Sequence, residues 1–268
     1  MKTPRQASGA IAFFAVLGLL APAASHAAEG SEGVTAVSSR VAAGYVRAKL
    51  PDGLFRQEGY SFGNGGYYGG PFPDGTIDNL SFLDIARIIS GPLADQGYLP
   101  SRDPKRTNLL IMVYWGTTTV PPPLDEGPVE TMDIRVRDRL DYENAMLLGY
   151  DSEGLIGTEW GNMMELTALR WHRRELVSEI EFNRYFVVLM AYDFQMLWKQ
   201  KKHKLLWETR FSINQRSNDF AKTLPVMAEY ASTYFGQDSH GLMRHRMPEG
   251  RVEIHEPSLI ELLGAPAK

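Results

Sequence analysis

Cysteine is absent from this sequence, so disulfide bridges, thiolate zinc sites and thiol catalysis are all excluded. A chain of 268 residues does not need such bridges, because a domain of this size buries enough apolar surface to fold without them. The same absence removes the lipid-bearing cysteine that follows the signal peptide of a bacterial lipoprotein. Residues 27–31, where that cysteine would lie, read Ala-Ala-Glu-Gly-Ser.

Long apolar runs are also scarce beyond the N-terminal region. The most apolar later segments are Leu109–Trp115 and Tyr185–Ala191, which have the length of a strand and fall far short of the ~20 residues of a membrane span. Basic residues are in slight deficit, 28 against 32 acidic, and both signs are mixed along the chain. The sequence therefore predicts no membrane span after signal cleavage and no nucleic acid partner.

Recognisable reactive motifs are missing as well. The sequence has no Gly-x-Ser-x-Gly, no Ser-x-x-Lys and no Gly-Lys-Ser/Thr, which excludes the common signatures of serine hydrolases and of nucleotide-binding loops. His240, His245 and His255 follow one another at spacings of five and ten, which match neither the His-Glu-x-x-His motif nor the paired histidines of a zinc finger. We therefore predict no cofactor and no metal site.

The N-terminal segment has the order of a secretory signal peptide. Lys2 and Arg5 precede the apolar run Ile11–Leu20, and a stretch of small residues follows up to Ala28. We expect cleavage between Ala27 and Ala28, so residues 1–27 are the signal peptide and the mature protein is periplasmic or secreted. An uncleaved membrane anchor is the weaker interpretation, because the apolar run has only about half the length of a span.

The first half of the remaining chain predicts a strand, a helix and a second strand. Residues 28–50 are expected to be a flexible lead, and residues 51–268 a single α+β domain. A first strand is predicted at Leu54–Phe62 and a buried one at Leu109–Trp115. Between them, apolar residues at helical spacing predict a helix from about residue 78 to Gly97, with a kink or break at Gly91–Pro92.

The second half predicts a helical insertion followed by a hairpin. The insertion spans about residues 125–184 and contains helices at 133–148 and 161–182. Two strands, 185–198 and 203–213, flank the charged turn 199–202. A last helix is predicted at 218–234 and a short strand at 251–254. We thus expect a mixed sheet of about four to five strands, made of the crossover unit and the C-terminal hairpin, with helices packed on it.

An aromatic, glycine-rich loop between Tyr60 and Gly75 is the first candidate for binding. Its candidate residues are Tyr60, Tyr67, Tyr68 and Phe72. Aromatic faces on such a loop can stack on sugar rings or on a proline-rich segment of a partner. The alternative is that some of these rings cover the sheet while the glycines serve tight turns.

Three carboxylates are candidates for chemistry or for structure. Asp74 and Asp78 resemble part of an oxygen-rich calcium turn, but the order and the distal glutamate of an EF-hand are missing, so a turn and a helix cap explain them. Asp193 interrupts an apolar strand, and a buried carboxylate needs a partner. We predict a structural ion pair between Asp193 and Arg210 on the facing strand.

The order of these segments resembles a group of uncharacterised exported proteins of Gram-negative bacteria that carry a small α+β domain of unknown function. The resemblance covers about residues 54–236 and depends on Gly97-Tyr98, the strand from Leu109 to Tyr114, Tyr192-Asp193 and the segment from Leu205 to Glu208. This chain departs from the commoner members by lacking the lipoprotein cysteine and by carrying the helical insertion. The resemblance implies an envelope location and this fold class, and no activity.

Two functions fit these observations. The leading hypothesis is a non-catalytic binding or assembly component of the bacterial envelope, whose partner is an envelope protein or a glycan. The alternative is a secreted hydrolase that acts on carbohydrate or cell-wall material, with Asp74, Asp78 and Asp193 converging near the aromatic loop.

Overall fold

The structure is a computed structural model that describes residues 33–120, 131–149, 179–180, 182–216 and 218–246. Its described part is an α+β fold, a seven-stranded mixed sheet with five helices. In chain order the elements are β1 (Val34–Val41), β2 (Glu58–Tyr68), α1 (Gly75–Asp78), α2 (Phe82–Asp95), β3 (Tyr98–Pro100), β4 (Leu109–Thr117), α3 (Thr131–Leu148), β5 (Arg184–Asp193), α6 (Phe194–Gln200), β6 (Leu205–Asn214), α7 (Phe220–Ser232) and β7 (Leu242–Arg246).

The sheet has the strand order β3-β2-β4-β5-β6-β1-β7. Strand β2 is parallel to both β3 and β4, while the other pairs are antiparallel. The α+β class and the mixed sheet were predicted, but the expectation of four to five strands is wrong. The predicted crossover unit contributes β2 and β4, and the predicted hairpin contributes β5 and β6. The sheet is larger because β1, β3 and β7 add three more strands.

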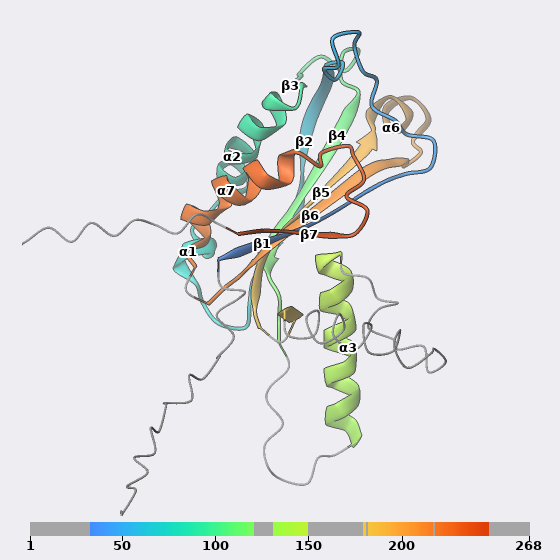
Figure 1. Cartoon of the computed structure of the whole chain (residues 1–268). Helices are drawn as coiled ribbons and strands as arrows, with labels where there is room; N and C mark the ends of the chain where they lie inside the picture. Colours follow the sequence, from blue (N-terminus) through green and yellow to red (C-terminus); the bar gives the residue numbers. More distant parts are fainter. Residues whose placement is uncertain (1–32, 121–130, 150–178, 181, 217, 247–268) are drawn as a thin grey trace, which may run out of the picture.

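Helices cover the two faces of the sheet unequally (Figure 1). Helices α2 and α7 lie against one face, where Ile85, Ile89, Leu224 and Met227 join the main apolar core. On the other face the C-terminal part of α3 packs through Ala145 and Leu148 in a smaller cluster. We call these the α2/α7 face and the α3 face.

Helix α2 shows how local sequence sets the boundaries. The Ser81 side chain accepts a hydrogen bond from Asp84 N, and the Asp84 carboxylate accepts one from Ser81 N, which forms a capping box at the start of the helix. A kink or a break was expected at Gly91–Pro92; the helix continues through Pro92 to Asp95, so it is not broken there. Gly97, with φ of 80°, then allows the chain to turn into β3.

The flexible lead predicted over residues 28–50 is wrong for Val34–Val41, which form β1 between β6 and β7. This strand is rich in small and polar residues, yet it is largely buried. The Ser39 hydroxyl lies 2.7 Å from Thr209 Oγ1 and donates to Tyr234 O at 2.9 Å. Such hydrogen bonds allow these polar side chains to be buried. The pattern of apolar residues in the sequence gives no sign of these hydrogen bonds.

Other boundaries also differ from the predictions. Strand β2 runs from Glu58 to Tyr68, so half of the expected glycine-rich loop is strand. Strand β5 ends at Asp193, and residues expected to extend it form α6, whose N-terminus Asp193 caps. Asp219 caps α7, which begins at Phe220 rather than at residue 218 as predicted. Three predictions lie outside the described residues: the signal peptide, the strand at 251–254 and most of the helix at 161–182. Of that helix, the structure describes only Glu179, Ile180 and Phe182.

A buried arginine fastens the segment before β2 to two helix ends. The Arg47 guanidinium lies between the rings of Phe55 and Tyr98, 4.0 Å and 4.1 Å from their centroids. It donates to Gln96 O at the end of α2 and to Phe235 O just after α7. A cation is favourable at these carbonyls because the C-terminus of a helix carries partial negative charge. Within the described part of the chain, we find no helix with the length and apolarity that a bilayer crossing requires.

Candidate functional site

The carboxyl ends of the parallel strands β2 and β4 meet at one edge of the sheet, which we call the carboxyl edge. Tyr67 and Trp115 come from the two strands, while Asp74 and Asp78 come from the loop and short helix α1 that follow β2. Tyr185, at the start of β5, completes the group. In open sheets with parallel strands, this is the edge at which ligands commonly bind.

Tyr67 is held firmly in place at this edge. Its ring stacks on Trp115 with 5.8 Å between centroids and 28° between planes, and Trp115 in turn stacks on Phe82 of α2. The Tyr67 hydroxyl donates a hydrogen bond to Asp78 Oδ1. Burial and the neighbouring Asp78 carboxylate raise the pKa of Tyr67, so the hydroxyl stays protonated. Even so, the residue is 40% exposed, which leaves ring surface available to a ligand.

Asp74 is an ionised carboxylate whose two oxygens are fully engaged. Oδ1 accepts from Thr76 N at 2.9 Å and from Thr76 Oγ1 at 2.8 Å. Oδ2 accepts from Tyr185 OH at 2.5 Å and from Gln215 Nε2 at 2.8 Å. Partial burial raises the pKa of Asp74, but these hydrogen bonds outweigh it and lower the pKa to about 2. Asp74 therefore fixes neighbouring groups and has no proton to donate at neutral pH.

Asp78 links the two parts of the group. Its Oδ1 accepts from Tyr67, and its Oδ2 accepts from Asp74 N at 2.6 Å. It is exposed to solvent, unlike the half-buried Asp74. Since a carboxylate accepts several hydrogen bonds, Asp78 can accept a further one from a ligand hydroxyl beside the Tyr67 ring.

The four predicted aromatic residues do not form one surface. Tyr60 is only 1% exposed and lies in the main core against Phe62. Tyr67 faces α2, but Tyr68 lies on the α3 face, where its ring centroid is 6.4 Å from that of Phe186. Phe72 is 78% exposed on the loop between β2 and α1. Successive residues of a strand point to opposite faces, which separates Tyr67 from Tyr68.

The predicted ion pair between Asp193 and Arg210 is not formed. In the sheet register Asp193 lies opposite Leu109, while Arg210 lies opposite Val188, five residues away along β5. The Asp193 carboxylate accepts from Met196 N as the N-cap of α6. Arg210 instead pairs with Glu208 and donates to carbonyls at the end of α3. Asp193 is also at the opposite end of the sheet from Asp74 and Asp78, so the three carboxylates do not converge.

Sequence reasoning missed Trp115, Tyr185 and Gln215. They lie far from the loop in sequence, and only strand pairing brings them to Tyr67 and Asp74. No local motif signals such a register. Trp115 Nε1 is buried without a hydrogen-bond partner within the described residues. In the same part of the chain, no three His, Cys, Asp or Glu side chains gather closely enough to hold a metal ion.

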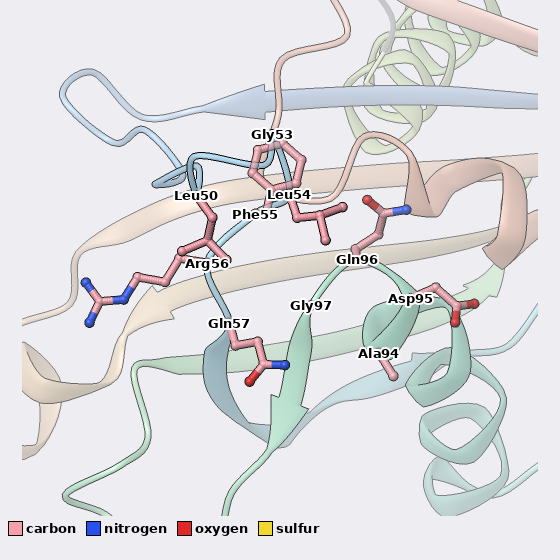
Figure 2. A pocket seen from close by; sticks show the side chains of 10 residues that line it. All are labelled: Leu50, Gly53, Leu54, Phe55, Arg56, Gln57, Ala94, Asp95, Gln96 and Gly97. Atoms are coloured by element: carbon pink, nitrogen blue, oxygen red, sulfur yellow. The ribbon is translucent and has the colours of Figure 1, made fainter.

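A cavity of about 680 Å³ lies at the other end of the sheet (Figure 2). It is bounded by the segment before β2, including Leu50, Leu54 and Phe55, and by the end of α2, including Asp95 and Gln96. Its size is within the range of small-molecule sites. None of the candidate site residues selected from the sequence (Tyr60, Tyr67, Tyr68, Phe72, Asp74, Asp78, Asp193 and Arg210) lines it.

Comparison with known proteins does not place this chain in a family. No family model matches it, and no curated protein is significantly similar. A solved structure of a PDZ domain protein from Parabacteroides distasonis aligns with a TM-score of 0.41 and 14% sequence identity over 80% of this chain. This chain spans 38% of the length of that protein's chain. A TM-score of 0.41 is too low to assign a shared fold or function.

Proposed function

We propose that this chain is an exported, non-catalytic binding protein of the bacterial envelope that recognises a glycan at the carboxyl edge. The observation that carries the proposal is the partly exposed Tyr67 ring, stacked on Trp115 and fixed to Asp78 by its hydroxyl group. A ring fixed in this way loses little conformational freedom when a ligand stacks on it.

A glycan suits the chemistry around this ring. One face of a sugar ring presents C–H groups that pack on an aromatic face, while the sugar hydroxyls donate hydrogen bonds. At the carboxyl edge the exposed Asp78 carboxylate is an acceptor beside the Tyr67 ring, and Phe72 adds a second exposed aromatic side chain. An apolar surface with a few fixed polar groups is the usual composition of a small-ligand site.

Binding without catalysis is favoured over the alternative of a secreted hydrolase. The catalytic carboxylate pair of a glycoside hydrolase needs one member that holds a proton near neutral pH and donates it to the leaving group. The hydrogen bonds from Tyr185, Gln215 and Thr76 keep the pKa of Asp74 at about 2, and Asp193 caps a helix at the far end of β5. This arrangement suits a structural anchor for the loop better than a general acid.

Export to the periplasm or the medium is part of the same proposal. It depends on the order of Lys2, Arg5, the apolar run Ile11–Leu20 and the small residues up to Ala28. The mass of the protein recovered from the envelope fraction tests it. A mass that corresponds to cleavage between Ala27 and Ala28 is expected, and the mass of the uncleaved chain would contradict export with cleavage.

Titration calorimetry with soluble oligomers of N-acetylglucosamine, a sugar of bacterial cell walls, tests the binding function. We expect the mature protein to bind them and the Tyr67→Ala variant to lose at least tenfold in affinity, because the stacking surface is removed. Tyr67→Phe keeps the ring and loses only the hydrogen bond to Asp78, so its loss should be smaller.

Tyr68→Ala is the matched control, because Tyr68 is the next residue of the same strand and faces the other way. It should bind as the unmodified protein does. Equal affinity for the Tyr67→Ala and unmodified proteins would reject the carboxyl edge as the glycan site. Cleavage of the oligomers during the titration would favour the hydrolase instead.

A further inference from the structure

Three segments that are distant in sequence meet at the end of the sheet opposite the carboxyl edge. They are residues 42–57 between β1 and β2, residues 101–108 between β3 and β4, and residues 194–204, which contain α6 and the turn before β6. Gln195 Nε2 donates to Pro104 O and to Thr107 O, both at 2.7 Å, which joins two of the segments. We call this surface the basic end; it lies at the top of Figure 1.

Positive charge is concentrated at the basic end, although the whole chain has a formal net charge of −4. The three segments carry nine exposed basic residues and only two acidic ones, Asp52 and Asp103. The nine are Lys49, Arg56, Arg102, Lys105, Arg106, Lys199, Lys201, Lys202 and Lys204. In the described part of the chain, none of the nine forms an ion pair with an acidic side chain.

Large apolar side chains are exposed on the same surface. Val46 is 85% exposed, Leu54 67% and Leu50 43%. Leu99 on β3 and Trp198 on α6 are each 41% exposed. Such a group of exposed apolar residues, surrounded by cations, is costly in water and marks an interaction surface.

Two hollows open between these side chains. Leu50, Leu54 and Phe55 line the cavity of about 680 Å³, and Figure 2 shows Arg56 reaching outward from it. A second cavity of about 400 Å³ is lined by Leu99, Arg102 and Arg106, and also by the acidic residues Glu58 and Asp103. The apolar and the cationic groups thus lie next to each other around concave surface.

We propose that the basic end docks onto an anionic phospholipid bilayer. Exposed lysine and arginine side chains are attracted to anionic headgroups, and the exposed leucine, valine and tryptophan side chains of the same segments can enter the boundary between headgroups and acyl chains. Trp198 suits this boundary because its ring is amphipathic. The attachment is peripheral, since it uses loops and one short helix.

A bilayer fits this surface better than a nucleic acid does. Phosphate backbones are recognised by cations and polar groups, and they offer nothing to exposed leucine and valine side chains. Val46, Leu50 and Leu54 together need an apolar phase, which acyl chains provide. This inference goes beyond the glycan proposal and does not depend on it.

The orientation that results leaves the carboxyl edge free. Strand β2 begins at the basic end and ends at Tyr68, so its eleven residues span roughly 35 Å at about 3.3 Å per residue. A protein attached through the basic end would hold Tyr67 well away from the membrane surface.

Co-sedimentation of the mature full-length protein with vesicles tests the proposal. One set of vesicles contains phosphatidylcholine alone, and the other contains phosphatidylcholine with phosphatidylglycerol. We expect binding to the anionic vesicles, weakened by salt, and little binding to the neutral ones. Lys202→Gln with Lys204→Gln should weaken it about tenfold or more. Leu50→Ser with Leu54→Ser should also weaken it, because apolar insertion is lost.

Arg87→Gln with Lys222→Gln is the matched control. It removes two exposed cations that lie on α2 and α7, outside the three segments, and should leave vesicle binding unchanged. All six substituted side chains are exposed to solvent, and circular dichroism verifies that the three double variants are folded. Equal binding to neutral vesicles, or an equal loss in the control, would overturn the proposal. So would binding to a DNA duplex as tight as that to vesicles, with no effect of the leucine changes.

Discussion

At the scale of single residues, Asp74 is the anchor of the carboxyl edge. Its side chain caps α1 through Thr76 N and also receives hydrogen bonds from β5 and from the segment after β6. One carboxylate thus connects the loop that follows β2 to strand β5 and to the segment after β6. Because hydrogen bonds to a charged group are among the stronger ones, this residue contributes to stability as well as to the position of Tyr67.

The pH dependence of stability tests this role. The pKa of Asp74 is lowered to about 2 in the folded protein, from 3.8 for an ordinary aspartate. A lowered pKa stabilises the folded state above pH 4, and this stabilisation is lost as the pH falls towards 2. At pH 7 we expect the free energy of unfolding of Asp74→Asn to be about 1–2 kcal/mol lower than that of the unmodified protein. Between pH 4 and pH 2 the variant should lose less stability than the unmodified protein does.

Urea unfolding of both proteins from pH 2 to pH 7 is the measurement. The difference in unfolding free energy should shrink as the pH approaches 2. A constant difference across this range would show that the ionised carboxylate of Asp74 is not what holds the loop.

Single residues were only partly predictable from the sequence. The sequence singled out Tyr67 and Phe72 as aromatic candidates, and both lie on or beside the carboxyl edge. It could not separate Tyr67 from Tyr68, because the glycines around them predicted a loop, whereas a strand with alternating faces continues through them. The partner of Asp193 was also misjudged, because the end of β5 was placed beyond Asp193 and its role as a helix cap was hidden.

At the scale of elements, the contact between β2 and β4 determines whether the carboxyl edge exists. Tyr68 pairs with Gly116, directly beside the pair of Tyr67 with Trp115. A Cβ atom at position 116 would overlap the carbonyl group of Tyr68. Glycine is therefore required here by close approach of the two backbones.

Gly116→Ala should destabilise the protein by about 1–3 kcal/mol, because the added methyl group forces the two strands apart. Gly91→Ala is the matched control, since Gly91 lies inside α2 and a Cβ there meets nothing within 4 Å. It should gain about 0.5–1 kcal/mol, because alanine favours a helix interior more than glycine does. Thermal unfolding of the two variants measures both changes in stability. A stable Gly116→Ala protein would contradict the close approach.

Elements with a strong apolar pattern were the ones that the sequence predicted well. Leu109–Trp115 lies within β4, and the helix expected before it corresponds to α2. Strands β1 and β7 were missed because small, polar or charged residues interrupt their few apolar positions, and pairing within the sheet makes them strands. Local propensity does not report such long-range pairing.

At the scale of the whole molecule, the two ends of the sheet differ in chemistry. The carboxyl edge gathers Tyr67, Asp74 and Asp78, whereas the basic end gathers unpaired cations and exposed apolar side chains. The sequence showed charges of both signs mixed along the chain and suggested an ordinary surface. The fold gathers nine of the cations, because the three segments that carry them lie at the same end of the sheet.

An amide chemical-shift titration of the protein lacking residues 1–27 with N-acetylglucosamine oligomers decides whether the carboxyl edge binds a glycan. We expect the largest changes between Tyr67 and Leu83 and at Tyr185, while residues 199–204 remain unchanged. Changes confined to the α3 face around Tyr68 and Tyr114, or the absence of any change at saturating oligomer, would contradict the glycan proposal.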